Sequence, residues 1–136
     1  MKKSIVLFTV LITSAASATA HTLTLAEKNK SYAEFVQAEK LSDIDNIRSF
    51  RYTGWKALSD DYLVITNTKK EDYLIQFKSR CLGLSKAKAV KLNRFSDSSL
   101  SSQYDTVSVV GPAAETCRIE SIYPISAEQS LTLSKV

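Results

Sequence analysis

The stretch YLIQFKSRCLGL (residues 73–84) decides the fold, because an apolar, strand-like run leads directly into a cysteine. Its apolar side chains recur at every second position from Tyr73 to Phe77, which is the period of a β-strand with one buried face. The chain holds one other cysteine, Cys117, so Cys81 has a single possible partner. The position of Cys81 therefore bears on both the compartment and the architecture.

The chain begins with the features of a secretory signal peptide. Two lysines precede an apolar run from Ser4 to Ile12, and a stretch of small residues ends in the A-T-A triplet at Ala20. This order predicts export, with cleavage after Ala20. The apolar run of about ten residues is shorter than the roughly 20 that a membrane-spanning helix needs, so we expect no membrane span in the mature form. We expect a periplasmic or secreted protein that has lost residues 1–20.

Length and charge limit the class of protein. Removing 20 of 136 residues leaves a chain that is long enough for one domain. The formal net charge of the whole chain is +4, and two of its lysines lie in the expected signal peptide. Such a small positive excess does not provide the basic face of a dedicated nucleic-acid-binding protein, so we expect no nucleic-acid partner.

The two cysteines predict a disulfide. An even number of cysteines in an oxidising compartment indicates a covalent bridge, and here only Cys81–Cys117 can form. Closing a loop of about 36 residues stabilises the fold by about 4 kcal/mol in the chain-entropy model. The alternatives are a reactive thiol or a metal ligand. Both need cationic, histidine or further cysteine neighbours, and the chain has one histidine, His21.

Runs of period two, separated by turns, predict a mainly β protein with an N-terminal helix. A capping-box pattern in residues 30–41 indicates the helix. The predicted strands are 47–58, 62–68, 73–78, 89–95, 104–110 and 117–125. About six short strands predict a small antiparallel barrel or sandwich, in which closure removes exposed edges. The expected division is signal peptide 1–20, helix and linker 21–46, β-rich domain 47–125 and a frayed C-terminal tail 126–136.

Two local features of the strands are more specific. The polar loop KKED (residues 69–72) between two β-like runs predicts a hairpin. In the last strand, alternation predicts one face shared by Cys117, Ile119, Ser121 and Tyr123.

A set of spaced residues also carries a resemblance. The set is Trp55-x2-Leu58-x-Asp60-x2-Leu63-Val64, Tyr73-Leu74-Ile75, Cys81-x2-Leu84-x2-Ala87, Asp105-x-Val107 and Cys117-x-Ile119-x2-Ile122. Over residues 44–125 the chain resembles a family of small secreted proteobacterial proteins known only as a domain of unknown function. The resemblance implies a compact, exported, β-rich domain in which the two cysteines pair. It supplies no activity, cofactor or catalytic residue.

His21 is the candidate for metal binding. Cleavage after Ala20 would place its α-amine and imidazole on one residue, a pair that can chelate copper. A histidine brace needs a second histidine, however, which the chain lacks. We therefore expect no metal and no cofactor, and copper binding at His21 stays an alternative.

Acidic residues are the candidates for catalysis. They are the turn pairs Asp60-Asp61 and Glu71-Asp72, and Asp105, which opens a strand beside Tyr104. Paired carboxylates perform acid–base chemistry when burial separates their pKa values, so a hydrolase or ligand-modifying enzyme is an alternative function. The simpler interpretation is that the turn acids are solvated and that Asp105 accepts backbone N–H groups. Tyr104 and Asp105 are also a possible ligand-binding pair.

Six cations, with no acid among them, lie between Tyr73 and Ser96. They are Lys78, Arg80, Lys86, Lys88, Lys91 and Arg94. This local charge suits an anionic partner such as phosphate, lipid head groups or envelope polysaccharide. The alternative is a solvated outer face of strands, whose lysines discourage unwanted strand pairing.

The aromatic residues form the last candidate surface. Phe50, Tyr52, Trp55, Tyr62 and Tyr73 fall in predicted strands, where such residues are more often core than binding surface. The sequence contains no Ser/His/Asp set and no phosphate-binding glycine loop. We therefore expect a non-catalytic binding or accessory protein rather than an enzyme. Its expected partner is an unidentified protein or an anionic envelope component.

Overall fold

The computed structural model describes residues 23–112 and 115–136. The expected signal peptide and His21 lie outside the described residues. The elements are α1 (Leu25–Ala38), β1 (Asn46–Arg48), β2 (Tyr52–Ala57), β3 (Tyr62–Asn67), β4 (Asp72–Phe77), the 3₁₀ turn η1 (Leu84–Lys86), β5 (Ala89–Asn93), β6 (Ser99–Ser101), β7 (Thr106–Val110), β8 (Glu115–Ile125) and α2 (Ala127–Ser134).

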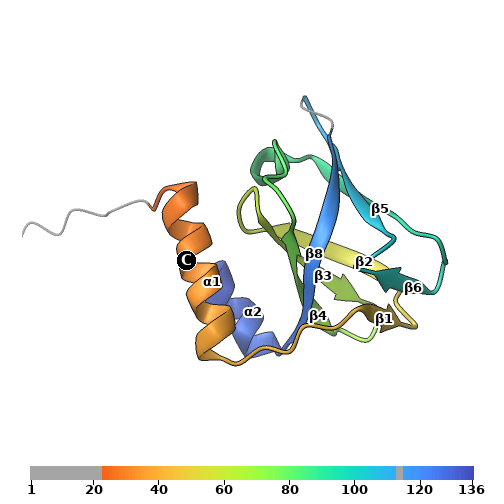
Figure 1. Ribbon diagram of the computed structural model, residues 1–136, viewed down its shortest axis with the longest axis horizontal. Coiled ribbons are helices and arrows are strands. Elements are labelled where there is room, and N and C mark those ends of the chain that lie inside the picture. The colour runs from red at the N-terminus through yellow and green to blue at the C-terminus, as the bar shows by residue number, and fades with distance from the viewer. Residues whose placement is uncertain (1–22, 113–114) are drawn as a thin grey trace, which may run out of the picture.

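Six strands form one antiparallel sheet, in the order β2-β3-β4-β8-β7-β5, which curls into a nearly closed barrel (Figure 1). Strands β1 and β6 pair separately as a short ribbon. The two edge strands meet through a side chain, because the Tyr52 hydroxyl donates to the Val90 carbonyl oxygen at 3.1 Å. The prediction of a mainly β fold with about six strands and an N-terminal helix is confirmed, as is the β3–β4 hairpin around residues 69–72.

The inside of the barrel is the larger apolar core. Alternate residues from every strand of the sheet face it, and the fully buried Phe50 packs edge-to-face against Tyr73 at a ring-centroid distance of 6.0 Å. The disulfide Cys81–Cys117 belongs to this core, with a Cα–Cα distance of 5.6 Å. The predicted pairing is confirmed, and it links the segment after β4 to β8.

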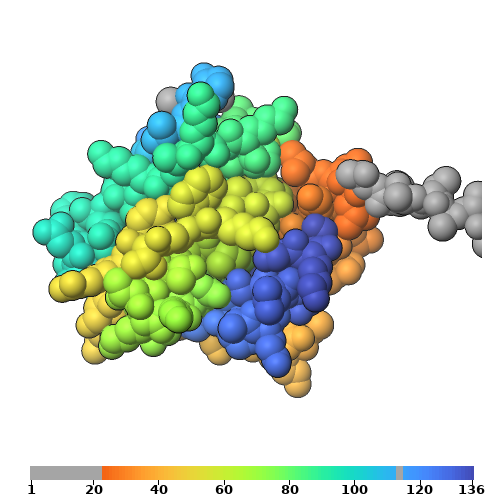
Figure 2. All heavy atoms as spheres, turned by 180° about the vertical axis from the view of Figure 1, so that it is seen from behind, coloured from red at the N-terminus to blue at the C-terminus, as the bar shows by residue number. Residues whose placement is uncertain are grey.

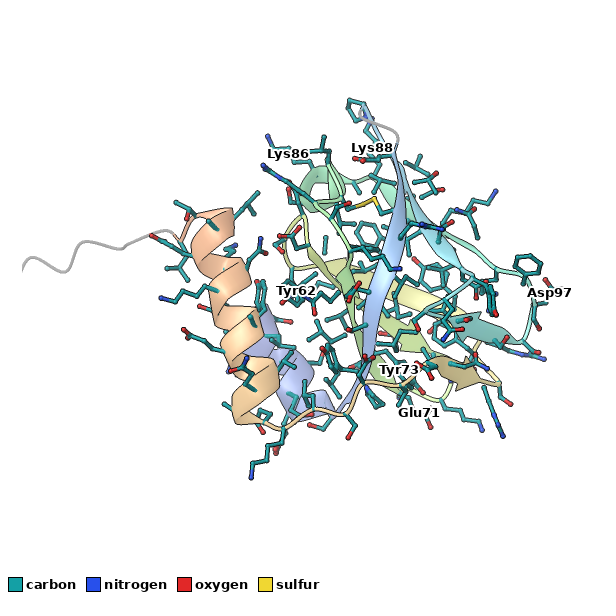
Figure 3. The ribbon with its side chains drawn as sticks, viewed as in Figure 1. Tyr62, Glu71, Tyr73, Lys86, Lys88 and Asp97 are labelled. Carbon is teal, nitrogen blue, oxygen red and sulfur yellow. A yellow bond between two sulfur atoms is a disulfide. The ribbon has the colours of Figure 1, made fainter. Side chains whose placement is uncertain are left out.

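A second core lies between the sheet and the helices. Helices α1 and α2 run side by side over the outer face of β3, β4 and the end of β8 (Figures 1 and 2). Tyr32 of α1 is buried there; its hydroxyl donates to the Leu58 carbonyl oxygen at 3.2 Å, and its ring meets Tyr62 edge-on. Figure 3 shows Tyr62 between the helices and the sheet. Leu133 places α2 in the same core.

Both helices differ from the sequence-based prediction. The expected frayed tail over 126–136 is instead helix α2, which begins with a capping box between Ser126 and Gln129. An eight-residue helix is marginal alone, and burial of Leu133 against the sheet stabilises it. Helix α1 begins at Leu25 rather than at residue 30, because Thr24 and Glu27 form its capping box.

Strand β8 also departs from simple alternation. Gln76 pairs with Ser121 and Phe77 with Ile119, so Glu120 is an extra residue on β8, as in a β-bulge. Beyond this bulge the faces exchange. Cys117 and Ile119 point into the barrel, whereas Tyr123 packs in the helix-covered core. The predicted common face of these residues is therefore wrong for Tyr123.

Candidate binding site

The outer face of β5, β7 and the start of β8 is polar, and the helices lie on the other side of the molecule (Figures 1 and 2). Its side chains bond across the strands. The Asn93 side-chain nitrogen donates to Thr106 Oγ1 at 3.1 Å and to Ser108 Oγ at 2.7 Å. Ser108 Oγ also lies 3.1 Å from Thr116 Oγ1. This face is a hydroxyl- and amide-bearing surface rather than an unfinished core.

Two aromatic side chains project from the end of this face. Phe95 is 91% exposed and Tyr104 is 70% exposed, and their rings meet edge-to-face at 6.3 Å between centroids. We call this pair the aromatic ridge. Asp97, two residues after Phe95, marks that end of the molecule in Figure 3, far from α1. Two large exposed aromatics in contact leave apolar surface in water, which usually indicates a binding surface.

A buried carboxylate fixes the backbone beneath the ridge. Asp105 is 3% exposed, and its two oxygens accept the Phe95 N–H at 2.9 Å and the Ser101 N–H at 2.6 Å. Asp105 also adjoins Tyr104 in sequence. The structure therefore brings Tyr104 and Asp105 together with the chain at Phe95, and the Asp105 carboxylate is engaged by the backbone.

The ridge separates two open pockets of different charge. The cationic pocket, of about 480 Å³, is lined by both ridge residues with Lys91, Leu92, Asn93, Arg94 and Thr106. The acidic pocket, of about 360 Å³, is lined by both ridge residues with Asp45, Asn46, Ser99, Ser101, Gln103 and Asp105. A ligand that contacts the ridge can therefore reach two chemically distinct surfaces.

The Arg94 guanidinium is held in place beside the cationic pocket. Its Nη1 donates to the Phe50 carbonyl oxygen at 2.9 Å, and its Cζ lies 5.7 Å from the centroid of the Phe50 ring. A guanidinium fixed in this way loses little side-chain freedom when it binds a carboxylate or phosphate. Lys91 is exposed and makes no ion pair with the described residues. The pocket thus combines a guanidinium that is held by a hydrogen bond with an exposed ammonium group.

The six predicted anion-binding residues do not all line the same pocket. Lys91 and Arg94 line the cationic pocket. Lys86 and Lys88 lie before β5, at the end of the molecule near the disulfide (Figure 3). The other two follow β4. Lys78 is exposed, and Arg80 pairs with Asp60 at 3.2 Å.

The candidate catalytic carboxylates are tied to separate parts of the chain. Asp60 is 4% exposed and accepts the Ser85 N–H at 3.1 Å as well as the Arg80 bond, so the solvated interpretation is wrong for this residue. Asp60 therefore holds the segment beside Cys81. Asp105 lines the acidic pocket, and Asp60 does not.

The remaining turn acids accept side-chain hydrogen bonds nearby. Asp61 accepts from Asn29 of α1. Glu71 accepts the Tyr73 hydroxyl at 3.0 Å, and Asp72 accepts the Thr66 hydroxyl at 2.7 Å. Figure 3 shows Glu71 and Tyr73 at the lower end of the sheet, away from Lys86 and Lys88.

Burial keeps several phenols in the neutral form, in which they can donate hydrogen bonds. It raises the pKa of Tyr52, whose hydroxyl joins the two edge strands, to about 12. Burial also raises the pKa of Tyr32, of Tyr62 and of Tyr73; the bond to Glu71 adds to the effect at Tyr73. Of the predicted strand aromatics, Phe50 and Tyr73 are buried in the barrel core, and Tyr62 is buried in the helix-covered core. Tyr52 and Trp55 are partly buried and pack against the barrel core.

Sequence reasoning missed Phe95 as a binding residue. The signal was present in the alternation of β5, because inward Val90 and Leu92 place odd-numbered residues on the outer face. Phe95 continues that outward series beyond the strand. An apolar residue at an outward position is the pattern that could have identified it.

Within residues 23–112 and 115–136, no cluster of three or more His, Cys, Asp or Glu side chains is arranged to hold a metal ion. None of the described helices is both long enough and apolar enough to cross a membrane.

The fold and surface define a small, disulfide-linked, mainly β domain with an exposed aromatic ridge. The chain belongs to the Family of unknown function (DUF6491), whose model matches residues 1–135. The expected kinship with a domain of unknown function is confirmed, and it extends beyond residues 44–125. No curated protein and no solved structure gives a significant match.

Proposed function

We propose that this chain is a non-catalytic binding protein that acts after export, and that the aromatic ridge is its binding surface. The observation that carries the proposal is the exposure of Phe95 and Tyr104, in contact with each other, at the end of the sheet. Elsewhere the large aromatic side chains of the described strands are buried or partly buried. The ridge is therefore an exception that a packed core does not explain.

Burial of the ridge by a partner offers a substantial driving force. Phenylalanine and tyrosine each bury roughly 150–250 Å² when covered, at about 25 cal/mol per Å² of apolar surface. The gross gain is therefore several kcal/mol, from which the costs of association are subtracted. Because Asp105 already fixes the Phe95 backbone, little ordering is needed on binding.

Export is supported by two features of different kinds. The first is the basic, apolar and small-residue order of the first 20 residues. The second is the Cys81–Cys117 disulfide, since such bonds persist in oxidising compartments. In this proposal the partner is a protein or an anionic component of the envelope.

Photo-crosslinking in the native host tests the proposal. A photoreactive amino acid replaces the exposed Ser96, beside the ridge, in the wild-type chain and in a Phe95→Ser/Tyr104→Ser variant. The control places the same group at Glu34, which is exposed on α1. We expect a discrete adduct from position 96 that is absent from position 34 and is lost in the ridge variant. An adduct of equal yield in the ridge variant contradicts the proposal.

A further inference from the structure

The charges on the two sides of the ridge indicate the chemical class of the partner. We propose that the ridge binds an extended polypeptide segment. An acidic side chain occupies the cationic pocket, an apolar side chain covers the ridge, and a basic side chain occupies the acidic pocket. This inference rests on the proposed function and adds the ligand class.

The cationic pocket suits a carboxylate. Lys91 and Arg94 line it without an acid, and Arg94 is held by its bond to the Phe50 carbonyl oxygen. The Arg94 N–H groups other than Nη1 make no hydrogen bond to the described residues, so they are free to form a bidentate pair. Asn93 and Thr106, whose side chains bond to each other, are the neutral polar residues of its lining.

The acidic pocket suits an ammonium or guanidinium group. No lysine, arginine or histidine is among its lining residues. Asp45 is exposed, and its carboxylate makes no hydrogen bond or ion pair with the described residues. Its backbone is fixed, because the Asp45 carbonyl oxygen accepts the Ser102 N–H at 2.9 Å. The pocket therefore presents one free carboxylate from an anchored position.

The aromatic ridge forms a wall that the two pockets share, because Phe95 and Tyr104 line both of them. A ligand that fills both pockets therefore passes over the two rings and meets both charges. An acidic polysaccharide places like charge against Asp45, which is unfavourable. A polypeptide can present a carboxylate, an apolar group and an ammonium group in succession on one chain. The charge pattern thus favours a protein partner over an anionic glycan.

Fluorescence anisotropy with labelled peptides tests the ligand class. The mixed-charge probes are Ac-EEGLFGKK-NH2 and its reversed-charge form Ac-KKGLFGEE-NH2. Three further probes each lack one feature: Ac-EEGSSGKK-NH2 has no apolar residue for the ridge, Ac-EEGLFGEE-NH2 has no basic end, and polygalacturonate is an acidic polysaccharide. We expect one of the two mixed-charge apolar peptides to bind the mature wild-type protein at least threefold more tightly than the serine and all-acidic peptides and the polysaccharide.

Charge-reversing substitutions at exposed residues of the two pockets are expected to change this preference among the peptides. Asp45→Lys is expected to reverse the order, so that the all-acidic peptide binds more tightly than the mixed-charge peptide. Lys91→Glu is expected to weaken the mixed-charge peptide about threefold to tenfold. The matched control is Lys56→Glu, an exposed lysine on β2 that lines neither pocket, and it is expected to change nothing.

Three results overturn the inference. They are tighter binding of polygalacturonate, an unchanged preference in Asp45→Lys, and failure of every peptide to bind. Each is distinguishable from failure of the proposed function. If the Ser96 adduct still depends on the ridge, the binding surface stands and the polypeptide assignment falls.

Discussion

One half of the outer surface of the sheet is covered by helices, and the other half is not. Over β3, β4 and the end of β8, helices α1 and α2 cover apolar residues such as Val64 and Leu74. Over β5, β7 and the start of β8, the outward residues include Asn93, whose side chain donates to Thr106 and to Ser108. The covered half is stabilised on both faces, whereas the uncovered half has one core face and carries the pockets.

The difference is visible strand by strand. Residues 62–65 of β3 are all buried, because inward Leu63 and Ile65 alternate with helix-facing Tyr62 and Val64. On β7, buried Val107 and Val109 alternate with partly exposed polar residues. In the half that the helices cover, both faces of the sheet contribute to stability. In the uncovered half, the outer face is available as a binding surface.

Loss of the disulfide is expected to have the largest effect. It lies in the barrel core and joins β8 to the segment after β4. Cys81→Ser with Cys117→Ser should lower the free energy of unfolding by about 4 kcal/mol, because the unfolded chain regains its loop entropy. Urea unfolding measures this change. Equal midpoints for the variant and the wild type would show that the uncovered half does not depend on the bond.

Leu74→Ala is expected to cause the second-largest loss of stability. Leu74 is fully buried between the sheet and the helices, so its truncation should cost about 3 kcal/mol. Val110→Ala, at an exposed position at the end of β7, is the matched control and should change stability by less than about 0.5 kcal/mol. Similar losses in both variants would remove the distinction between the halves.

Asp105→Ala should cost about 2 kcal/mol, because the Phe95 and Ser101 N–H groups lose their acceptor. Asp105→Asn keeps one acceptor oxygen and should lie between the wild type and the alanine variant. Chemical denaturation measures both variants. A neutral alanine variant would show that the backbone beneath the ridge does not need this carboxylate.

The seam between β2 and β5 should weaken at alkaline pH. The pKa of Tyr52 is about 12 in the folded chain, against an ordinary value of 10.0. Stability is therefore full below pH 10 and falls between pH 10 and 12, as the unfolded chain releases the proton first. Tyr52→Phe should reduce this slope in urea midpoints measured across that range. Tyr32, Tyr62 and Tyr73 shift in the same direction and should retain part of it.

The ridge variants should have the smallest effect on stability. Phe95→Ala with Tyr104→Ala removes exposed rings, so we expect a change within about 0.5 kcal/mol while the position 96 crosslink is lost. Thermal unfolding and crosslinking are measured on the same preparations. A loss comparable to that of Leu74→Ala would mean that the ridge is part of the core.

Much of the fold could be predicted from local pattern. Alternation located the six strands of the main sheet, and the two cysteines allowed one pairing. The pattern failed where a long-range contact overrides it. The bulge at Glu120 lies within the pairing of β8 with β4, and helix α2 packs through Leu133 in the core that it shares with the sheet.

The candidate site was predicted in part. Lys91, Arg94, Tyr104 and Asp105 were singled out from the sequence, and the structure places all four at the ridge pockets. Lys78, Arg80, Lys86 and Lys88 were grouped with them because they are neighbours in sequence. Strand β5 carries the chain away from them, which spacing alone does not indicate.

The sequence by itself determined the strand periodicity, the covalent bridge and the presence of cations without acids over residues 74–95. Tertiary structure alone decided which outer face is covered, that Phe95 meets Tyr104, and that carboxylates lie on the far side of both rings. The physical reason is that periodicity depends on neighbours along the chain. Exposure and charge separation depend on which distant segments pack together.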